Sequence, residues 1–179
     1  MAAKERARTH IRLLGLDPGL VKTGWGIVDS DGVRLSHVAC GTVHTDSTDE
    51  ISVRLVTLYE GLTAIIGEWR PDAAAVEETF VNRNPASALK LGLARGVVLL
   101  APAQAGLPVA EYHNRTIKKS VVGAGRASKE QVGLMVGRLL PGCRPDSEDA
   151  ADALAIAICH AHHEGTGGRW RAAMVGSAA

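Results

Sequence analysis

The sequence predicts an α/β fold in which a mixed five-stranded sheet lies between helices. Short apolar runs separated by turn residues fill residues 11–43, as in strands connected by tight turns. Apolar residues then recur at spacings of three and four, which is the period of a helix with one buried face. Further short apolar runs alternate with longer helical stretches, and this order is typical of a sheet covered by helices.

The first three strands are expected to form an antiparallel meander. Ile11–Leu16 is an apolar run that ends at the turn residues Asp17-Pro18-Gly19. Trp25–Val28 and Val33–Val43 follow, with Asp31-Gly32 between them as a hairpin turn. Strands joined by such short connections pair with their neighbours in the chain.

The first helix is predicted from a regular set of apolar positions: Ile51, Leu55, Leu58, Leu62, Ile65 and Trp69. Ser47 and Glu50 fit a capping box at its start, and Pro71 lies just beyond its end. The rest of the chain predicts two more strands and four more helices: Ala73–Val76, Asn84–Ala105, Pro108–Tyr112, and helical stretches near 114–122, 128–140 and 147–162.

Length and composition indicate one folded domain. The 179 residues are 46% hydrophobic and carry a net charge of +1, which excludes a disordered chain and a histone-like polycation. We expect a domain over residues 10–163 with flexible tails at 1–9 and 164–179. Three cysteines without CxxC spacing predict free thiols. The sequence has no signal peptide and no run of 18 apolar residues, so we expect a soluble, cytoplasmic protein with no membrane partner.

Four acidic residues are placed where they could meet at one edge of the sheet. Asp17 and Glu77 follow two apolar strands, and ligands of α/β proteins bind outside strand ends. Asp149 and Asp152 lie three residues apart on an alanine-rich helix thin enough to approach the sheet closely. Converging carboxylates repel unless a cation neutralises them, and Mg²⁺ or Mn²⁺ prefers oxygen ligands. Two such ions can clamp the oxygens of a phosphodiester during hydrolysis.

Each acid also has a purely structural interpretation. Aspartate before Pro-Gly is common in turns, and aspartate in a first helical turn complements the helix dipole. These roles do not explain why acids end the apolar strand at Val76-Glu77-Glu78-Thr79. Taken together, the four residues favour a metal site.

Positive charge is concentrated in the middle third of the chain. Residues 79–129 contain eight lysines and arginines and a single acid, Glu111, so the remainder is net negative. A polyanion gripped by cations beside a metal centre would suit this distribution, although helices that simply display solvated side chains would produce it too. Phe80, the only phenylalanine, lies in a polar stretch close to Arg83. It could stack on a nucleic-acid base or fold back onto its own helix.

Other motifs give weaker signals. Gly19 and Gly24 have glycine-loop spacing, but Trp25 follows where a phosphate-binding loop needs lysine. The thiol and imidazoles near residue 160 lack a complete zinc ligand set: Cys159, His160, His162 and His163. No nucleophilic serine or cysteine arrangement is present.

From about Arg12 to His163 the sequence resembles the RuvC family of Holliday-junction endonucleases. The segments that carry the resemblance are Leu16-Asp17-Pro18-Gly19, Thr23-Gly24-Trp25-Gly26, Val76-Glu77-Glu78, Ser87-Ala88-Leu89-Lys90-Leu91-Gly92, Ala94-Arg95-Gly96, Lys118, Val121-Val122-Gly123 and Asp149-Ala150-Ala151-Asp152-Ala153-Leu154-Ala155. In this order they are highly specific, whereas the first alone is not.

The resemblance implies an RNase H-like fold and a homodimer that nicks four-way DNA junctions at symmetric positions. It implies that two Mg²⁺ or Mn²⁺ ions per subunit bind the family's acids, which fall on Asp17, Glu77, Asp149 and Asp152. The implied DNA contacts are Lys118, Lys129 and the loop aromatic Phe80, with Arg83 nearby. A RuvA-RuvB branch-migration complex is the implied partner.

Two alternatives are weighed against this function. An actin-like or sugar-kinase fold also has an acidic turn after its first strand, but it needs a second lobe for which 179 residues leave no room. A junction-binding module without catalysis is the other alternative, and the presence of all four acids argues against it.

Overall fold

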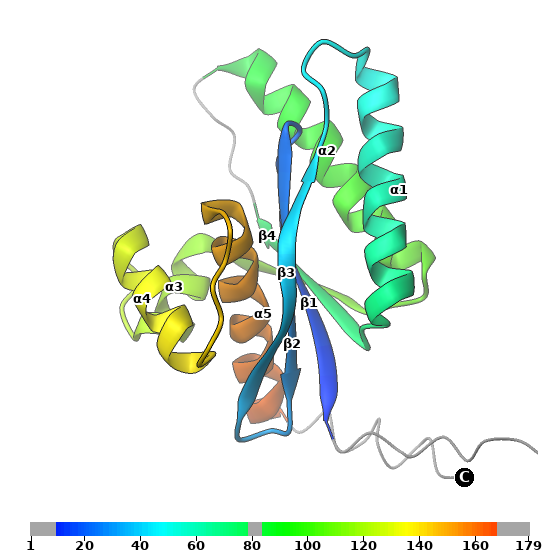
Figure 1. Cartoon of the computed structure of the whole chain (residues 1–179). Helices are drawn as coiled ribbons and strands as arrows, with labels where there is room; N and C mark the ends of the chain where they lie inside the picture. Colours follow the sequence, from blue (N-terminus) through cyan, green and yellow to red (C-terminus); the bar gives the residue numbers. More distant parts are fainter. Residues whose placement is uncertain (1–9, 79–83, 168–179) are drawn as a thin grey trace, which may run out of the picture.

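The computed structural model describes residues 10–78 and 84–167 and contains a five-stranded mixed sheet (Figure 1). Its strands are β1 (Ile11–Asp17), β2 (Lys22–Ser30), β3 (Leu35–His44), β4 (Ala73–Glu78) and β5 (Val109–His113). They lie in the order β3-β2-β1-β4-β5. β1 pairs antiparallel with β2 and parallel with β4, β2 and β3 are antiparallel, and β4 and β5 are parallel. The predicted mixed sheet with an antiparallel meander is confirmed.

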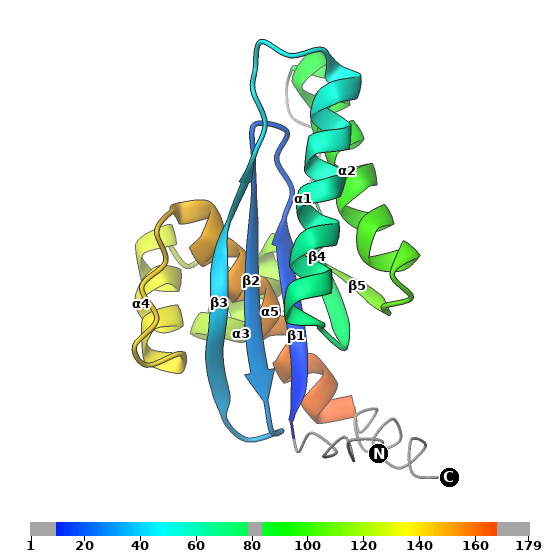
Figure 2. The same ribbon diagram turned by 45° about the vertical axis from the view of Figure 1, so that its right-hand side comes forward.

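Helices cover both faces of the sheet, as Figure 2 shows. One face packs against α1 (Ile51–Trp69) and α2 (Pro85–Gln104). The other packs against α5 (Glu148–Gly167), with α3 (Asn114–Val122) and α4 (Lys129–Leu139) outside it. Each face has its own apolar core, because successive strand residues point to opposite sides of the sheet. Leu13 and Val28 belong to the α5 core, and Leu14 and Ile27 to the α1 core.

The contact between α5 and the sheet is unusually close, because the facing strand positions are glycines. A Cβ added at Gly15 would lie 2.0 Å from the carbonyl oxygen of Ala153, and one at Gly24 would lie 2.0 Å from that of Asp149. The alanine-rich face of α5 and these glycines therefore bring the helix backbone directly onto β1 and β2. This confirms the expectation that the thin helix approaches the sheet closely.

Several predicted boundaries hold and others need correction. Gly32 has a φ of 91° in the expected hairpin, where Asp31 Oδ1 accepts hydrogen bonds from the backbone amides of Val33 and Arg34. The Asn84 side chain caps α2. The capping box at α1 is wrong, because α1 starts after Glu50 with no side-chain cap. Helix α5 continues to Gly167, so the first four residues of the predicted tail from 164 are helical.

Helix α2 is long and apolar enough to span a membrane by length and composition alone. Its Ala94, Val98 and Ala101 are buried in the core that α1 and the sheet share. Figure 1 shows α2 lying beside α1 along the same face of the sheet.

Candidate metal centre

The register of the sheet places Asp17 beside Glu77. β1 and β4 run parallel with Leu16 opposite Val76, so the acids that follow these residues are neighbours at the same sheet edge. Leu16 and Val76 point into the α1 core, and alternation therefore turns Asp17 and Glu77 toward the α5 side.

Alternation also separates the two consecutive glutamates that end β4. Glu78 is directed away from the side to which Glu77 turns, and it forms an ion pair with His113. Of the two glutamates, only Glu77 joins the candidate centre.

Helix α5 brings the remaining two acids to the same edge. Gly24 pairs with Asp17 across β1 and β2, and the backbone of Asp149 lies directly against Gly24. Asp152 is one turn further along α5, on the same face. The structure therefore brings together all four acids that the sequence singled out.

The electrostatics of the site reflect this convergence. Burial, followed by the charges of Glu77, Asp152 and Asp149, raises the pKa of Asp17 to about 8. Burial also raises the pKa of Glu77, and the charge of Asp152 acts in the same direction. The raised pKa values of Asp17 and Glu77 show that this half-buried cluster of oxygen ligands is short of positive charge. This donor set fits a hard divalent cation such as Mg²⁺ or Mn²⁺.

A neutral side chain orients one of these acids. Asn114 Nδ2 donates a hydrogen bond to Glu77 Oε1 at 2.8 Å, and this bond lowers the pKa of Glu77 against the effect of burial. No motif in the sequence singles out Asn114. The rule that found Glu77 could have found it, because Asn114 directly follows β5, the parallel neighbour of β4.

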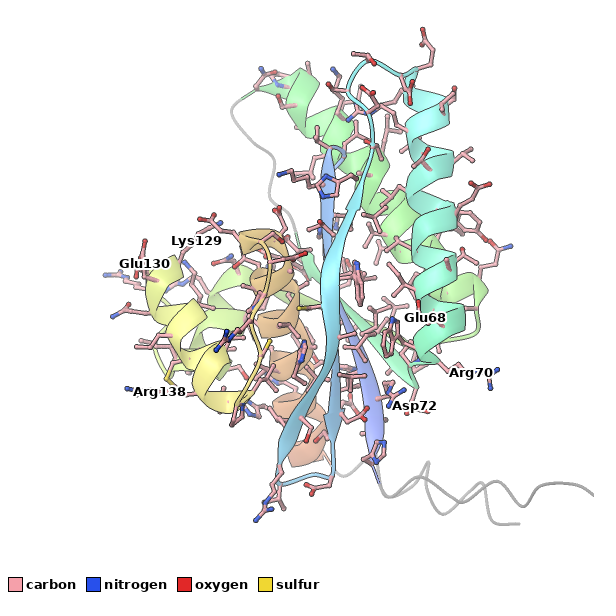
Figure 3. All side chains as sticks on the ribbon, in the orientation of Figure 1. Glu68, Arg70, Asp72, Lys129, Glu130 and Arg138 are labelled. Carbon is pink, nitrogen blue, oxygen red and sulfur yellow. The ribbon has the colours of Figure 1, made fainter. Side chains whose placement is uncertain are left out.

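The two predicted DNA-binding lysines both lie near the acids. Lys129 begins α4 beside the start of α5 (Figure 3), and its Nζ is 3.2 Å from Asp152 Oδ2 and 3.8 Å from Glu148 Oε2. The charge of Asp152 and its hydrogen bond raise the pKa of Lys129. Lys118 on α3 is close enough to lower the pKa of Glu77. The ion pair with Glu148 was not foreseen.

Two predicted DNA contacts, Phe80 and Arg83, lie outside the described residues. The residues near position 160, which lack a complete zinc ligand set, make other contacts. His160 hydrogen-bonds Tyr112, and the ring of His163 stacks on the same tyrosine.

Comparison with known proteins gives consistent matches along the chain. The family model described as crossover junction endodeoxyribonuclease RuvC matches residues 13–160. The enzyme of that name from Paramagnetospirillum magneticum is 63% identical over 156 residues, covering 87% of this chain and 94% of the relative. The one from Xanthobacter autotrophicus is 60% identical over 164 residues, covering 92% and 97%.

Solved structures agree with this result. Thermus thermophilus RuvC in complex with a Holliday junction substrate superimposes with a TM-score of 0.83 at 35% identity, covering 88% of this chain and 97% of that chain. The yeast mitochondrial Holliday junction resolvase Ydc2 matches at 13% identity with a TM-score of 0.63, covering 90% and 82%, and supports the RNase H-like fold. Nucleases of this kind are metal-dependent, in keeping with the four carboxylates. The chain belongs to the RuvC family of crossover junction endodeoxyribonucleases.

Proposed function

We propose that this protein resolves four-way DNA junctions in recombination and repair by paired, metal-dependent nicks. The observation that carries the proposal is the convergence of Asp17, Glu77, Asp149 and Asp152 from β1, β4 and α5. The Thermus thermophilus relative with which the chain superimposes was solved in complex with a Holliday junction substrate.

The four acids would hold two Mg²⁺ or Mn²⁺ ions per subunit. Such ions, when bound, supply an activated water and stabilise charge on the attacking and leaving oxygens. Asn114 holds the Glu77 carboxylate by its hydrogen bond and favours the ionised form that a cation needs. The close seat of α5 on Gly24 fixes Asp149 relative to Asp17.

Positively charged side chains beside the acids would grip the DNA backbone. Lys118 and Lys129 border the carboxylates from α3 and α4, where they can contact the phosphates next to the scissile bond. Phe80 and Arg83 follow Glu77 closely in sequence, and we assign them base stacking and phosphate contact at the branch point.

Paired cuts at symmetric positions need two centres related by a two-fold axis, and we propose a homodimer. Helix α2 supplies a suitable surface. Leu89, Leu93 and Leu100 fall on one stripe of the helix and are 69%, 41% and 54% exposed. An exposed stripe of leucines on a soluble domain marks a contact surface.

The proposed dimer would act in the cytoplasm, on junctions delivered by a RuvA-RuvB branch-migration complex. Membership of the family supports both assignments, since the relatives are bacterial enzymes that act on DNA.

The experiment is a nicking assay on a synthetic four-way junction with Mg²⁺. Asp17→Asn should abolish cutting and leave junction binding intact or tighter, because a negative charge beside the phosphates is removed. Asp49→Asn, an exposed acid before α1, is the matched control and should cut normally. Normal cutting by Asp17→Asn would refute the assignment of the metal centre. If the wild-type protein binds junctions without cutting them, the protein is a junction-binding module without catalysis.

A further inference from the structure

A second group of possible metal ligands lies at the β3 edge of the sheet. His37 and Cys40 lie on the edge strand β3, and Cys143 lies in the loop between α4 and α5. One ligand atom from each, an imidazole nitrogen or a thiol sulfur, lies within 4.8 Å of the other two. Figure 1 shows this loop running along β3, so the three residues join segments that are a hundred positions apart in the sequence.

An irregularity in β3 brings its two ligands to the same side of the sheet. His37 and Cys40 are three residues apart, a spacing that places side chains on opposite faces of a regular strand. Here His37 pairs with Val28 and Ala39 pairs with Ile27, so Val38 is an extra residue in a β-bulge. The bulge restores His37 and Cys40 to the face that carries α5.

The side chains at this place are half-buried and incompletely satisfied. Among the described residues, His37 Nε2 is a buried nitrogen without a hydrogen-bond partner. Cys40 and Cys143 pack against the apolar core under α5, and all three cysteines are free of disulfides. A buried imidazole nitrogen without a partner is costly unless a further group satisfies it, and this imidazole lies beside two thiols.

We propose that His37, Cys40 and Cys143 bind one Zn²⁺ ion, separate from the carboxylate centre. Zinc accepts sulfur and nitrogen ligands in tetrahedral geometry, and the mutual spacing of these atoms suits ligands of one ion. Three protein ligands leave a fourth position, which water or the nearby carboxylate of Asp146 can take. Mg²⁺ does not compete for this site, since it prefers oxygen ligands.

The ion would tie the loop before α5 to the edge strand. Cys143 precedes Asp149 by six residues, so the bound loop would steady the start of the helix that carries two acids of the metal centre. Binding must displace the protons of both thiols. Burial raises the pKa of Cys40 to about 11 and also raises that of Cys143, so the two protons are released to solvent when the ion binds at neutral pH.

The test is titration of the reduced, metal-free full chain with Co²⁺, a spectroscopic substitute for Zn²⁺. We expect one equivalent to produce an intense thiolate-to-cobalt charge-transfer band and tetrahedral d–d bands, which Zn²⁺ then abolishes by displacement. Carboxylate-bound Co²⁺ gives no thiolate band, so Asp17→Asn should leave this signal unchanged. Zn²⁺ should also raise the melting temperature of the wild type.

Substitutions assign the signal to these residues. Cys40→Ser and Cys143→Ser should each lose the charge-transfer intensity, and His37→Gln should weaken Co²⁺ binding at least tenfold. Cys159→Ala removes a buried thiol of α5 that is not one of the proposed ligands, and it should keep the full signal. The proposal is overturned if the folded wild type shows no thiolate band, if Cys159→Ala loses it, or if Cys40→Ser retains it. Circular dichroism confirms that each variant is folded.

Discussion

Replacing Gly24 with alanine tests whether the close contact between α5 and β2 sets the geometry of the acids. The new Cβ would lie 2.0 Å from the carbonyl oxygen of Asp149 and 2.5 Å from its carbonyl carbon, whereas real Cβ contacts under 3.0 Å are essentially never seen. The obstacle is backbone and cannot rotate away, so the start of α5 must move by about 1 Å, as overpacked cores do. Asp149 then moves relative to Asp17, which faces Gly24 in the sheet.

A displacement of this size affects activity more than folding. Misplacing a reacting group by about 1 Å costs on the order of 10²-fold in rate, or about 2.7 kcal/mol of barrier. Overpacking costs about 1–3 kcal/mol of unfolding free energy, out of roughly 5–15 kcal/mol for a typical domain. The Gly24→Ala protein should therefore remain folded and cut junctions about a hundredfold more slowly than the wild type.

The assay combines single-turnover cleavage of a synthetic junction with thermal unfolding of the same samples. Gly67→Ala is the matched control, because Gly67 is an exposed helical glycine and the added methyl group would meet no atom within 4 Å. It should gain roughly 0.5–1 kcal/mol of stability and cut at the normal rate. A wild-type rate for Gly24→Ala, or a rate loss fully explained by unfolded protein, would refute the reasoning.

Four further outcomes are expected. In chelator, the unfolding free energy of the wild type, measured by calorimetry, should fall as pH rises from 4 to 8, because the pKa of Asp17 is higher in the folded protein than in the unfolded chain. The fall is at most about 1.4 kcal/mol per pH unit. The Asp17→Asn protein should not show it. Asn114→Ala should raise the pKa of Glu77 and shift the acid limb of the pH–rate profile to higher pH. Lys118→Ala should reduce the salt slope of junction affinity by about 1. Leu93→Lys should shift the monomer–dimer equilibrium, measured by sedimentation, toward monomer. An unchanged equilibrium would place the dimer surface elsewhere.

Much of the fold could be predicted because the sequence pattern is local and regular. The apolar run Ile11–Leu16 forms β1, and the apolar positions predicted for α1 are buried or half-buried in the structure except Ile51, which is exposed. The convergence of the four acids could be predicted because the same apolar patterns show where β1 and β4 end and which face of α5 packs on the sheet. Asn114 was missed because only the strand order of the folded sheet shows that β5 lies beside β4.

Contacts between distant segments were beyond the sequence analysis. The start of α1 was misplaced because its turn is organised by Asp46, which accepts hydrogen bonds from the backbone and hydroxyl of Thr48. Cys40 and Cys143 gave no motif, since their proximity depends on a β-bulge and on the path of a loop. The start of α1 and the proximity of these two cysteines both depend on tertiary structure, which a local sequence pattern does not predict.

Because β1 and β4 pair in parallel, the register of these strands sets the relative positions of two acids of the metal centre. Removing one residue from β1 would shift Asp17 against Glu77 by one place and turn it to the opposite side of the sheet, while exchanging the residues that fill both cores. The hairpin at residues 31–34 has no such coupling, since it lies beyond the ends of its strands. We therefore expect a change of length within β1 to disrupt both the core packing and the metal centre, whereas a change of length in the hairpin at residues 31–34 should leave both in place.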